Sequence, residues 1–246
     1  MNTLITGANG MLGSVLSKTY TKAVLLKGKS DLDLTKFQCV KKFLKDTTFD
    51  TIIHCAAYTD LGYCEKNKTE CIALHSGIVP VLQSFCKKLI YISTNPTNSK
   101  RIYYESKKMG EKLCLERKGD LIIRTNIYGD GGLVKWAVDS VKQNKSINGY
   151  SNVIFNPVSV SQLSSFIHLE GEKYTGVINI CSNEVISKYN FLKIILKKLK
   201  LNHKLLTPME IKGDLDLTIP AKHGHITYDL NKGVNSLCEN LNPKTT

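Results

Sequence analysis

The first half of the chain alternates short apolar runs with segments whose apolar residues recur every three or four positions. Short apolar runs between polar residues are typical of buried strands, and the longer spacing is typical of helices with one buried face. Because strands and helices alternate, the pattern predicts an α/β fold with a doubly wound parallel sheet. The predicted strands are 4–5, 23–26, 51–54, 89–93 and 121–124, and the predicted helices are 11–18, 36–44 (capped by Thr35), 71–87 and 103–116.

The second half is less regular. It predicts helices at 133–143, 160–169 and 189–199 and one strand at 177–180. No internal repeat and no linker divides the chain. We therefore expect a main domain over 1–150 and a smaller C-terminal portion over 151–246, interleaved with the first.

A glycine-rich turn follows the first predicted strand. Gly7, Gly10 and Gly13 are spaced Gly-x-x-Gly-x-x-Gly, and Met11 and Leu12 lie at the start of the helix that follows. A strand that turns sharply into a helix while its N–H groups approach a pyrophosphate needs residues without a Cβ. The strand, turn and helix context predicts that these five residues bind a dinucleotide in a Rossmann domain.

The residues after the second strand indicate the type of dinucleotide. An acidic residue that binds the ribose 2′-hydroxyl is usual there in NAD-binding folds, whereas this chain has Lys27. An ammonium group suits a 2′-phosphate, so NADP(H) is favoured, with NAD(H) as the alternative if the lysine is merely solvated. Asp33 and Leu34 are placed to meet the adenine.

The third strand ends in small residues. Cys55, Ala56 and Ala57, followed by Tyr58, come directly after it. Small side chains are needed where the backbone approaches a nicotinamide ribose. We therefore predict that these residues also contact the cofactor.

Tyr103 and Lys107 lie four residues apart on a predicted helix, and hence on one face. A fixed ammonium near a phenol is expected to lower its pKa, so that it can exchange a proton with a carbonyl or alcohol. The Tyr-x-x-x-Lys pattern occurs four times, starting at Tyr103, Tyr104, Tyr189 and Tyr228. Only the first two follow the fourth strand and its hydroxyl-bearing end, Ser93-Thr94. Ser106 and Gly110 favour the pair that starts at Tyr103, and Tyr104 with Lys108 is the alternative.

Composition excludes several classes of protein. The formal net charge is +13, but only three of the basic residues are arginines and the lysines are scattered, which argues against nucleic-acid binding. The eight cysteines lack the spacing of a metal site or of a disulfide framework. No apolar run is long enough to span a bilayer. We expect a cytoplasmic protein with no metal and no membrane association.

Taken together, these motifs resemble the dTDP-4-dehydrorhamnose reductases, a branch of the extended short-chain dehydrogenase/reductases. The resemblance continues through later segments and spans nearly the whole chain; its motifs are the three-glycine turn, Ala56–Thr59, Ser93-Thr94, Tyr103–Lys107, Arg124–Gly129 and Asn156–Val158. It implies hydride transfer from NAD(P)H to the C4 keto group of a 4-keto-6-deoxy sugar linked to dTDP or UDP. Such enzymes are often homodimers.

The resemblance also implies roles for individual residues. Tyr103 would donate the proton, Lys107 would bind the nicotinamide ribose and tune Tyr103, and Thr94 would bind the carbonyl oxygen. Asn126 and Asn156 would contact the substrate. His75, where the family tends to carry asparagine, is expected to pack rather than act as an acid or base.

Three departures keep other functions open, one of which is that Lys222-His223-Gly224-His225 stands where the family has an Arg-Pro-x-Asn-like segment. Only eight residues separate Thr94 from Tyr103, where the family has a longer loop that walls the substrate, and Asn95 replaces the usual aspartate. One alternative is an epimerase-reductase or a 4-epimerase of nucleotide sugars, although the cysteine that the epimerase-reductases carry after the fourth strand is missing. The other is a non-catalytic, NADP-binding regulatory subunit.

Overall fold

The computed structural model describes residues 2–96, 98–213, 215–220 and 224–242, so Lys222 and His223, where the sequence departs from the family, lie outside the described residues. A seven-stranded sheet runs in the order β13-β10-β5-β4-β3-β1-β2, with strands β1 Thr3–Thr6, β2 Val24–Leu26, β3 Phe49–His54, β4 Cys86–Ser93, β5 Leu121–Thr125, β10 Gly176–Ser182 and β13 His225–Tyr228. Neighbouring strands are parallel, with Ile5 opposite Ile53 and Ile53 opposite Ile90. The predicted parallel α/β fold is confirmed.

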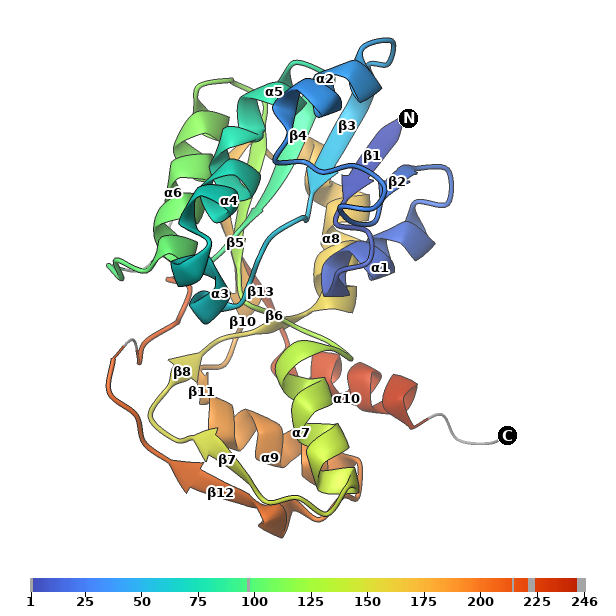
Figure 1. The fold of residues 1–246 in the computed structure, drawn as a ribbon. Coiled ribbons are helices and arrows are strands. Elements are labelled where there is room, and N and C mark those ends of the chain that lie inside the picture. Colours follow the sequence, from blue (N-terminus) through green and yellow to red (C-terminus); the bar gives the residue numbers. More distant parts are fainter. Residues whose placement is uncertain (1, 97, 214, 221–223, 243–246) are drawn as a thin grey trace. The chain divides into compact units, whose positions relative to one another are not determined.

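The chain divides into two compact units, of which the first comprises residues 1–124 and 164–178. Its helices are α1 Met11–Thr19, α2 Phe37–Leu44, α3 Leu61–Lys66, α4 Lys68–Ile72, the π-helical turn η1 Ala73–Gly77, α5 Val79–Gln83, α6 Ile102–Leu115, most of α8 Val160–Glu170 and the short η2 Gly171–Lys173. Helices α2, α4, α5 and α6 cover one face of the sheet, and α1 and α8 cover the other (Figure 1). The apolar strand residues and the inner faces of α2 and α5 form one core cluster.

The predicted helix over 71–87 is wrong as a continuous element. The structure has α4, the turn η1 and α5 there, and β4 begins at Cys86. Pro80 lies in the first turn of α5; it lacks an N–H group, and its ring would clash with the carbonyl group four residues earlier. Thr35 is not a helix cap either, because α2 begins after Lys36 and the Thr35 hydroxyl donates to Asp33 Oδ1 instead.

The second unit comprises residues 125–163 and 179–246. Besides β13, its strands form the parallel pairs β6 Ile127–Tyr128 with β9 Val158–Ser159 and β7 Ile147–Tyr150 with β12 Leu206–Met209, and the antiparallel pair β8 Ile154–Phe155 with β11 Ile186–Ser187. Its helices α7 Gly132–Lys142, α9 Lys188–Lys198 and α10 Leu230–Leu241 share a core of their own, and η3 His203–Leu205 is a short turn. The expected boundary at 150 falls inside this unit, because residues 125–163 pair with C-terminal strands.

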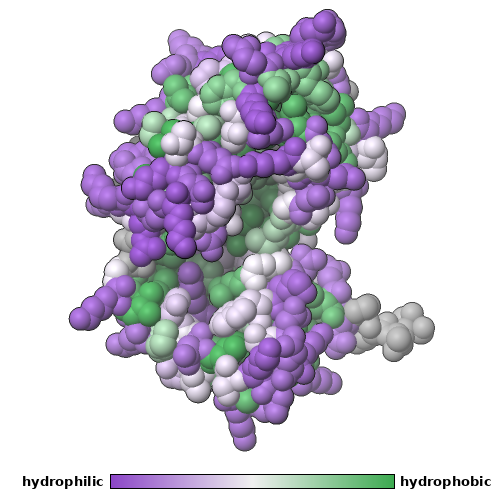
Figure 2. All heavy atoms as spheres, in the orientation of Figure 1, coloured by the Kyte–Doolittle hydropathy of each residue, from purple (hydrophilic) through white to green (hydrophobic). Residues whose placement is uncertain are grey.

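Hydrophilic side chains are spread over the visible face rather than gathered in one tract (Figure 2). Within the described part of the chain, no helix has the length and apolar character that crossing a membrane requires. The same residues contain no cluster of histidine, cysteine or acidic side chains suited to a metal ion.

Candidate functional site

The turn between β1 and α1 requires glycine at two of its three positions, Gly7 and Gly13, and is tight at Gly10. Gly7 has a φ of +67°, and a Cβ there would lie 2.7 Å from the backbone of Ala56. A Cβ on Gly13 would lie 2.1 Å from the Gly7 oxygen, and one on Gly10 would lie 3.1 Å from it. The turn is closed by the Gly10 N–H group, which donates to the Gly7 oxygen at 2.8 Å. The backbone of the turn and of the end of β3 therefore lies too close for a larger residue at Gly7 or Gly13.

Helix α1 points its N-terminus at this turn. Its N-cap is Gly10, which has no side chain with which to cap the helix. The first N–H groups of a helix have no partners within the helix, and they carry partial positive charge. Those of Met11, Leu12 and Gly13 are thus placed to meet an anion, and their predicted contact with a dinucleotide stays a prediction.

A cavity of about 230 Å³ opens beside the turn. Eight of the predicted cofactor residues line it, namely Gly7, Gly10, Lys27, Asp33, Leu34, Ala56, Ala57 and Tyr58. Cys55, expected beside the alanines, lines it too, and so do Leu26, Leu32, Thr35 and Leu74, which sequence reasoning did not assign to the site. Leu26 could have been found at the end of a predicted strand, whereas nothing in the sequence marks Leu74.

The two lysines at this cavity differ in their partners. The Lys29 ammonium is paired with Glu70 and lies 5.7 Å from the centre of the Tyr58 ring. Glu70 also accepts hydrogen bonds from the hydroxyls of Tyr58 (2.8 Å) and Tyr63 (2.7 Å). The Lys27 side chain is exposed, while its N–H group donates to Asp31 Oδ2 at 2.8 Å. Of the two lysines, Lys29 thus has a carboxylate partner among the described residues, whereas the Lys27 ammonium is the more available one for a ligand at the cavity.

Asp33 is held by a local turn. Its Oδ1 accepts hydrogen bonds from the Thr35 hydroxyl (2.7 Å) and the Thr35 N–H group (3.0 Å). The hydroxyl bond, with a further contribution from the N–H bond, lowers the pKa of the Asp33 carboxyl. The carboxylate is thus fixed in the cavity wall.

Thr94 and Tyr103 meet at the end of β4. Thr94 follows the last strand residue, Tyr103 lies in the first turn of α6, and a hydrogen bond links their side chains. The Thr94 hydroxyl also donates to Asn95 Oδ1 at 3.1 Å. Burial raises the pKa of Tyr103 to about 12, and the bond to Thr94 opposes that rise. Tyr103 is therefore protonated at neutral pH.

Lys107 lies one turn further along α6 and is 3% exposed. Its Nζ donates to the Ile92 oxygen at 2.8 Å and lies 4.9 Å from the centre of the Tyr91 ring. Burial lowers the pKa of Lys107 to about 8, so the side chain is mostly cationic at pH 7. The expected lowering of the pKa of Tyr103 is not found, because desolvation outweighs the other effects on the phenol and the ammonium binds Ile92.

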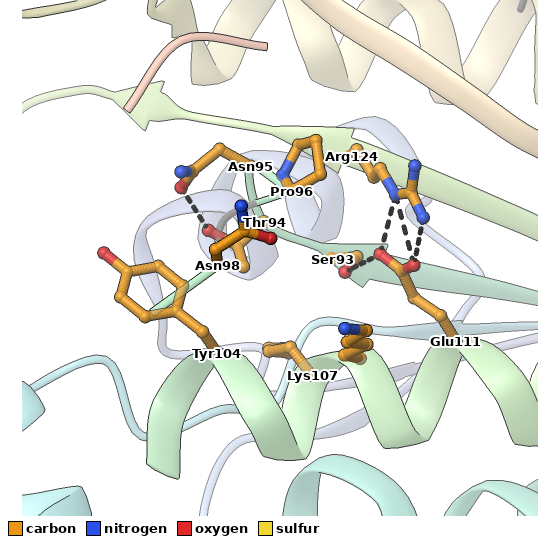
Figure 3. Close-up of a pocket in the computed structure, with 10 residues that line it drawn as sticks. Ser93, Thr94, Asn95, Pro96, Asn98, Tyr104, Lys107, Glu111 and Arg124 are labelled. Carbon is orange, nitrogen blue, oxygen red and sulfur yellow. Dashed lines mark hydrogen bonds and ion pairs between the residues drawn. The ribbon is translucent and has the colours of Figure 1, made fainter. Parts of the chain in front are cut away.

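A second cavity, of about 240 Å³, lies at Thr94 and Lys107. Tyr104 lines it, as do Ser93, Asn95, Pro96, Asn98, Lys108, Glu111 and Arg124 (Figure 3). Glu111 is bound by the Arg124 guanidinium through two nitrogens and by the Ser93 hydroxyl at 2.5 Å. Both members of the alternative pair, Tyr104 and Lys108, line this cavity, and Tyr103 is not among its lining residues. Tyr103 is favoured because Thr94 is hydrogen-bonded to it and because Lys108 is exposed, whereas Lys107 is buried.

His75 is completely buried, which confirms the expectation that it packs. Its Nε2 accepts a hydrogen bond from the Tyr58 N–H group at 2.9 Å, so the ring proton lies on Nδ1, 2.8 Å from Ser106 Oγ. Burial first, and then the charge of Lys107, lowers the pKa of His75 to about 2. With both nitrogens engaged and the ring neutral, His75 is not suited to acid or base chemistry.

Asn126 and Asn156 lie in the second unit, where backbone groups engage their amides. Asn126 Nδ2 donates to the Leu217 oxygen at 2.5 Å. Asn156 exchanges two hydrogen bonds with the backbone of Ile219, at 2.8 and 3.0 Å. Both asparagines hold the segment 215–220 in place, and their predicted contact with substrate stays a prediction.

A parallel sheet whose first strand turns through three close-packed glycines into a helix defines a Rossmann-type dinucleotide-binding protein. The family model described as "RmlD substrate binding domain" matches residues 1–216, and the chain belongs to that family.

Curated relatives and solved structures agree with this assignment. The chain is 24% identical over 230 residues to the spore coat polysaccharide biosynthesis protein SpsK of Bacillus subtilis, covering 83% of this chain and 81% of that protein. It is 28% identical over 154 residues to a dTDP-4-dehydrorhamnose reductase of Streptomyces griseus, about half of each chain (52% and 51%).

The fold matches solved structures over nearly its full length. A dTDP-4-dehydrorhamnose reductase of Clostridium acetobutylicum superimposes with a TM-score of 0.86 at 22% identity, covering 98% of this chain and 99% of that one. The enzyme of the same name from Bacillus anthracis, solved in complex with NADP, gives a TM-score of 0.84 at 22% identity, covering 96% and 98%.

Proposed function

We propose that this protein is an NADPH-dependent reductase of the C4 keto group of a 4-keto-6-deoxy nucleotide sugar, of the dTDP-4-dehydrorhamnose reductase type. Its family and the names of its relatives support a nucleotide-sugar oxidoreductase. The observation that carries the proposal is the hydrogen bond between Tyr103 and Thr94 at the end of β4, with Lys107 one turn further along the helix that carries Tyr103. A non-catalytic, NADP-binding subunit would not need a phenol bonded to a hydroxyl beside a buried lysine.

The residues at the glycine turn fit a dinucleotide. The turn is a cradle that a Cβ on Gly7 or Gly13 would fill, and the helix N-terminus behind it suits a pyrophosphate. Lys27 would bind a 2′-phosphate, Asp33 and Leu34 would meet the adenine, and Ala56 to Tyr58 would line the path to the nicotinamide ribose. When bound, NADPH supplies the hydride.

The chain's own residues would manage the proton. With its pKa at about 12, Tyr103 carries the proton that a reduced C4 oxygen must receive. The Thr94 hydroxyl has a single proton, which it donates to Asn95; turned to the C4 oxygen instead, that proton would make a hydrogen bond that favours negative charge developing there. Lys107 would hold a ribose hydroxyl, and its positive charge would stabilise the Tyr103 phenolate left after proton transfer.

Turnover tests the proposal directly. We expect the purified protein to oxidise NADPH with dTDP-4-keto-6-deoxyglucose only when a separate 3,5-epimerase is present, because a simple reductase acts on the epimerised sugar. The UDP-linked sugar, tested in parallel, identifies the nucleotide. Oxidation without the epimerase would indicate a bifunctional enzyme, and tight NADPH binding without oxidation of any such sugar would contradict the proposal.

A further inference from the structure

His75 connects two parts of the candidate site that lie on different elements. It lies in the π-helical turn η1, and its ring is completely buried. On one side it binds the N–H group of Tyr58, in the loop that follows β3 and lines the dinucleotide cavity. On the other side it binds Ser106 on helix α6. One side chain therefore links the cofactor loop to the helix that carries Tyr103 and Lys107.

The hydrogen-bond directions along this connection are fixed by the available protons. An N–H group can only donate, so His75 Nε2 accepts from Tyr58 and the ring proton lies on Nδ1. Nδ1–H then donates to Ser106 Oγ at 2.8 Å, and the Ser106 hydroxyl donates its own proton to the Tyr103 backbone oxygen at 3.0 Å. Every proton in this series of hydrogen bonds has an acceptor, and only the neutral Nδ1–H form of the ring allows that arrangement.

The His75 ring also sets the position of the phenol. It lies edge-on to the Tyr103 ring, with 5.9 Å between ring centres and an angle of 89° between ring planes. The turn itself is anchored, because the Tyr91 hydroxyl donates to the His75 backbone oxygen at 2.7 Å. A π-helical turn inside a helical segment is often found at functional sites, and here it directs the ring between the cofactor loop and α6.

We propose that His75 is a positioning residue for the reaction: it holds the Tyr58 backbone and the Tyr103 side chain in register, so that cofactor binding and proton donation depend on the same ring. The effect on proton donation rests on the proposed function. The effect on cofactor binding requires only that the protein binds a dinucleotide.

Two variants of His75 and one of His54 test the inference. His75→Leu removes both hydrogen bonds, whereas His75→Gln keeps an amide that can accept from Tyr58 and donate to Ser106. His54→Leu is the matched control, because His54 is equally buried but binds Thr6 and the Leu74 oxygen and makes no bond to α6. Any general cost of losing a buried histidine appears in this control as well.

We expect His75→Leu to raise the Kd for NADPH about tenfold and to lower kcat at least tenfold, with His75→Gln recovering most of both. His54→Leu should lower stability comparably while changing Kd and kcat less than threefold. If folded His75→Leu and His54→Leu behave alike in Kd and kcat, or if His75→Gln recovers neither, His75 is merely structural and the inference is wrong.

The tautomer and the protonation of the His75 ring can be measured without any catalytic reaction. In ¹⁵N-labelled protein, the His75 ring should show the Nδ1–H tautomer and should not titrate between pH 8 and pH 5.5, with Tyr103, Lys107, His54 and Tyr58 as its polar neighbours. An Nε2–H tautomer or a titration in that interval would overturn the inference. If the wild type binds NADPH but reduces no keto sugar, the proposed function fails, while the tautomer and the Kd series still decide whether His75 organises the cofactor loop.

Discussion

Two buried neutral histidines should make the protein sensitive to mild acid. His54 and His75 are both completely buried, and burial, with the charge of Lys107, lowers their pKa values to about 3 and about 2. An unfolded chain protonates histidine near pH 6.5. Below that pH the two histidines bind protons in the unfolded state but not in the folded state. The free energy of unfolding is therefore highest above pH 6.5 and decreases as the pH falls.

The magnitude depends little on the folded pKa values, because both lie well below pH 5. Each histidine should lower the free energy of unfolding by about 1.4 kcal/mol per pH unit once the pH is below 6.5. Between pH 7.5 and pH 5 the loss is therefore about 2 kcal/mol per histidine, or about 4 kcal/mol for the pair. That is a large share of the roughly 5 to 15 kcal/mol that stabilises an ordinary domain.

Urea unfolding at several pH values measures this loss. His54→Leu and His75→Leu should each be less stable than the wild type at pH 7.5, but each should lose about 2 kcal/mol less between pH 7.5 and pH 5. Because the comparison is between variants, the other histidines and the carboxylates cancel. If the pH dependence of both variants matched that of the wild type, the two rings would be protonated in the folded protein and the hydrogen-bond scheme given for them would be wrong.

Other predictions follow from the glycine turn and the lysines. Gly13→Ala places a Cβ 2.1 Å from a backbone oxygen and should lower the free energy of unfolding by at least about 3 kcal/mol, measured by thermal unfolding. Gly28→Ala is the control: its Cβ meets nothing within 4 Å, and it should cost less than about 1 kcal/mol in that assay. Because the pKa of Lys107 is about 8, kcat/KM should fall as the pH rises through 8; a flat profile to pH 9.5 would contradict its cationic role. Lys27→Gln should raise the Kd for NADPH at least about tenfold and leave the Kd for NADH unchanged. Lys29→Gln should raise the Kd for NADPH less, because a glutamate already pairs with Lys29. Equal increases in the Kd for NADPH would show that the two lysines are equivalent.

The sequence predicts the sheet and most of the cavity beside the glycine turn for the same reason. Fully buried parallel strands are continuous apolar runs, and the cavity is formed by residues at the carboxyl ends of those strands, so strand positions locate Lys27, Ala56 and Tyr58. The glycine turn adds Gly7 and Gly13, whose spacing is visible without any structure.

The rest of the fold and of the site depends on local geometry that the spacing of hydrophobic residues does not reveal. The break at Pro80 and the turn η1 bring His75 to Ser106 and Leu74 to the cavity, and a regular helix over the same residues would direct them elsewhere. In the second unit, strands of two residues, such as Ile127–Tyr128, are too short to show any period. The raised pKa of Tyr103 likewise follows from burial, which the sequence does not reveal.

The measurement that tests the central claim most directly is single-turnover reduction by the wild type and by Tyr103→Phe, with NADPH and the epimerised dTDP-4-keto-6-deoxy sugar. Phenylalanine keeps the ring that packs on His75 and removes only the proton donor. We predict that the rate falls at least about a hundredfold, while the Kd for NADPH changes less than about threefold. A variant that reduces the sugar at the wild-type rate would show that Tyr103 is not the proton donor and would contradict the account.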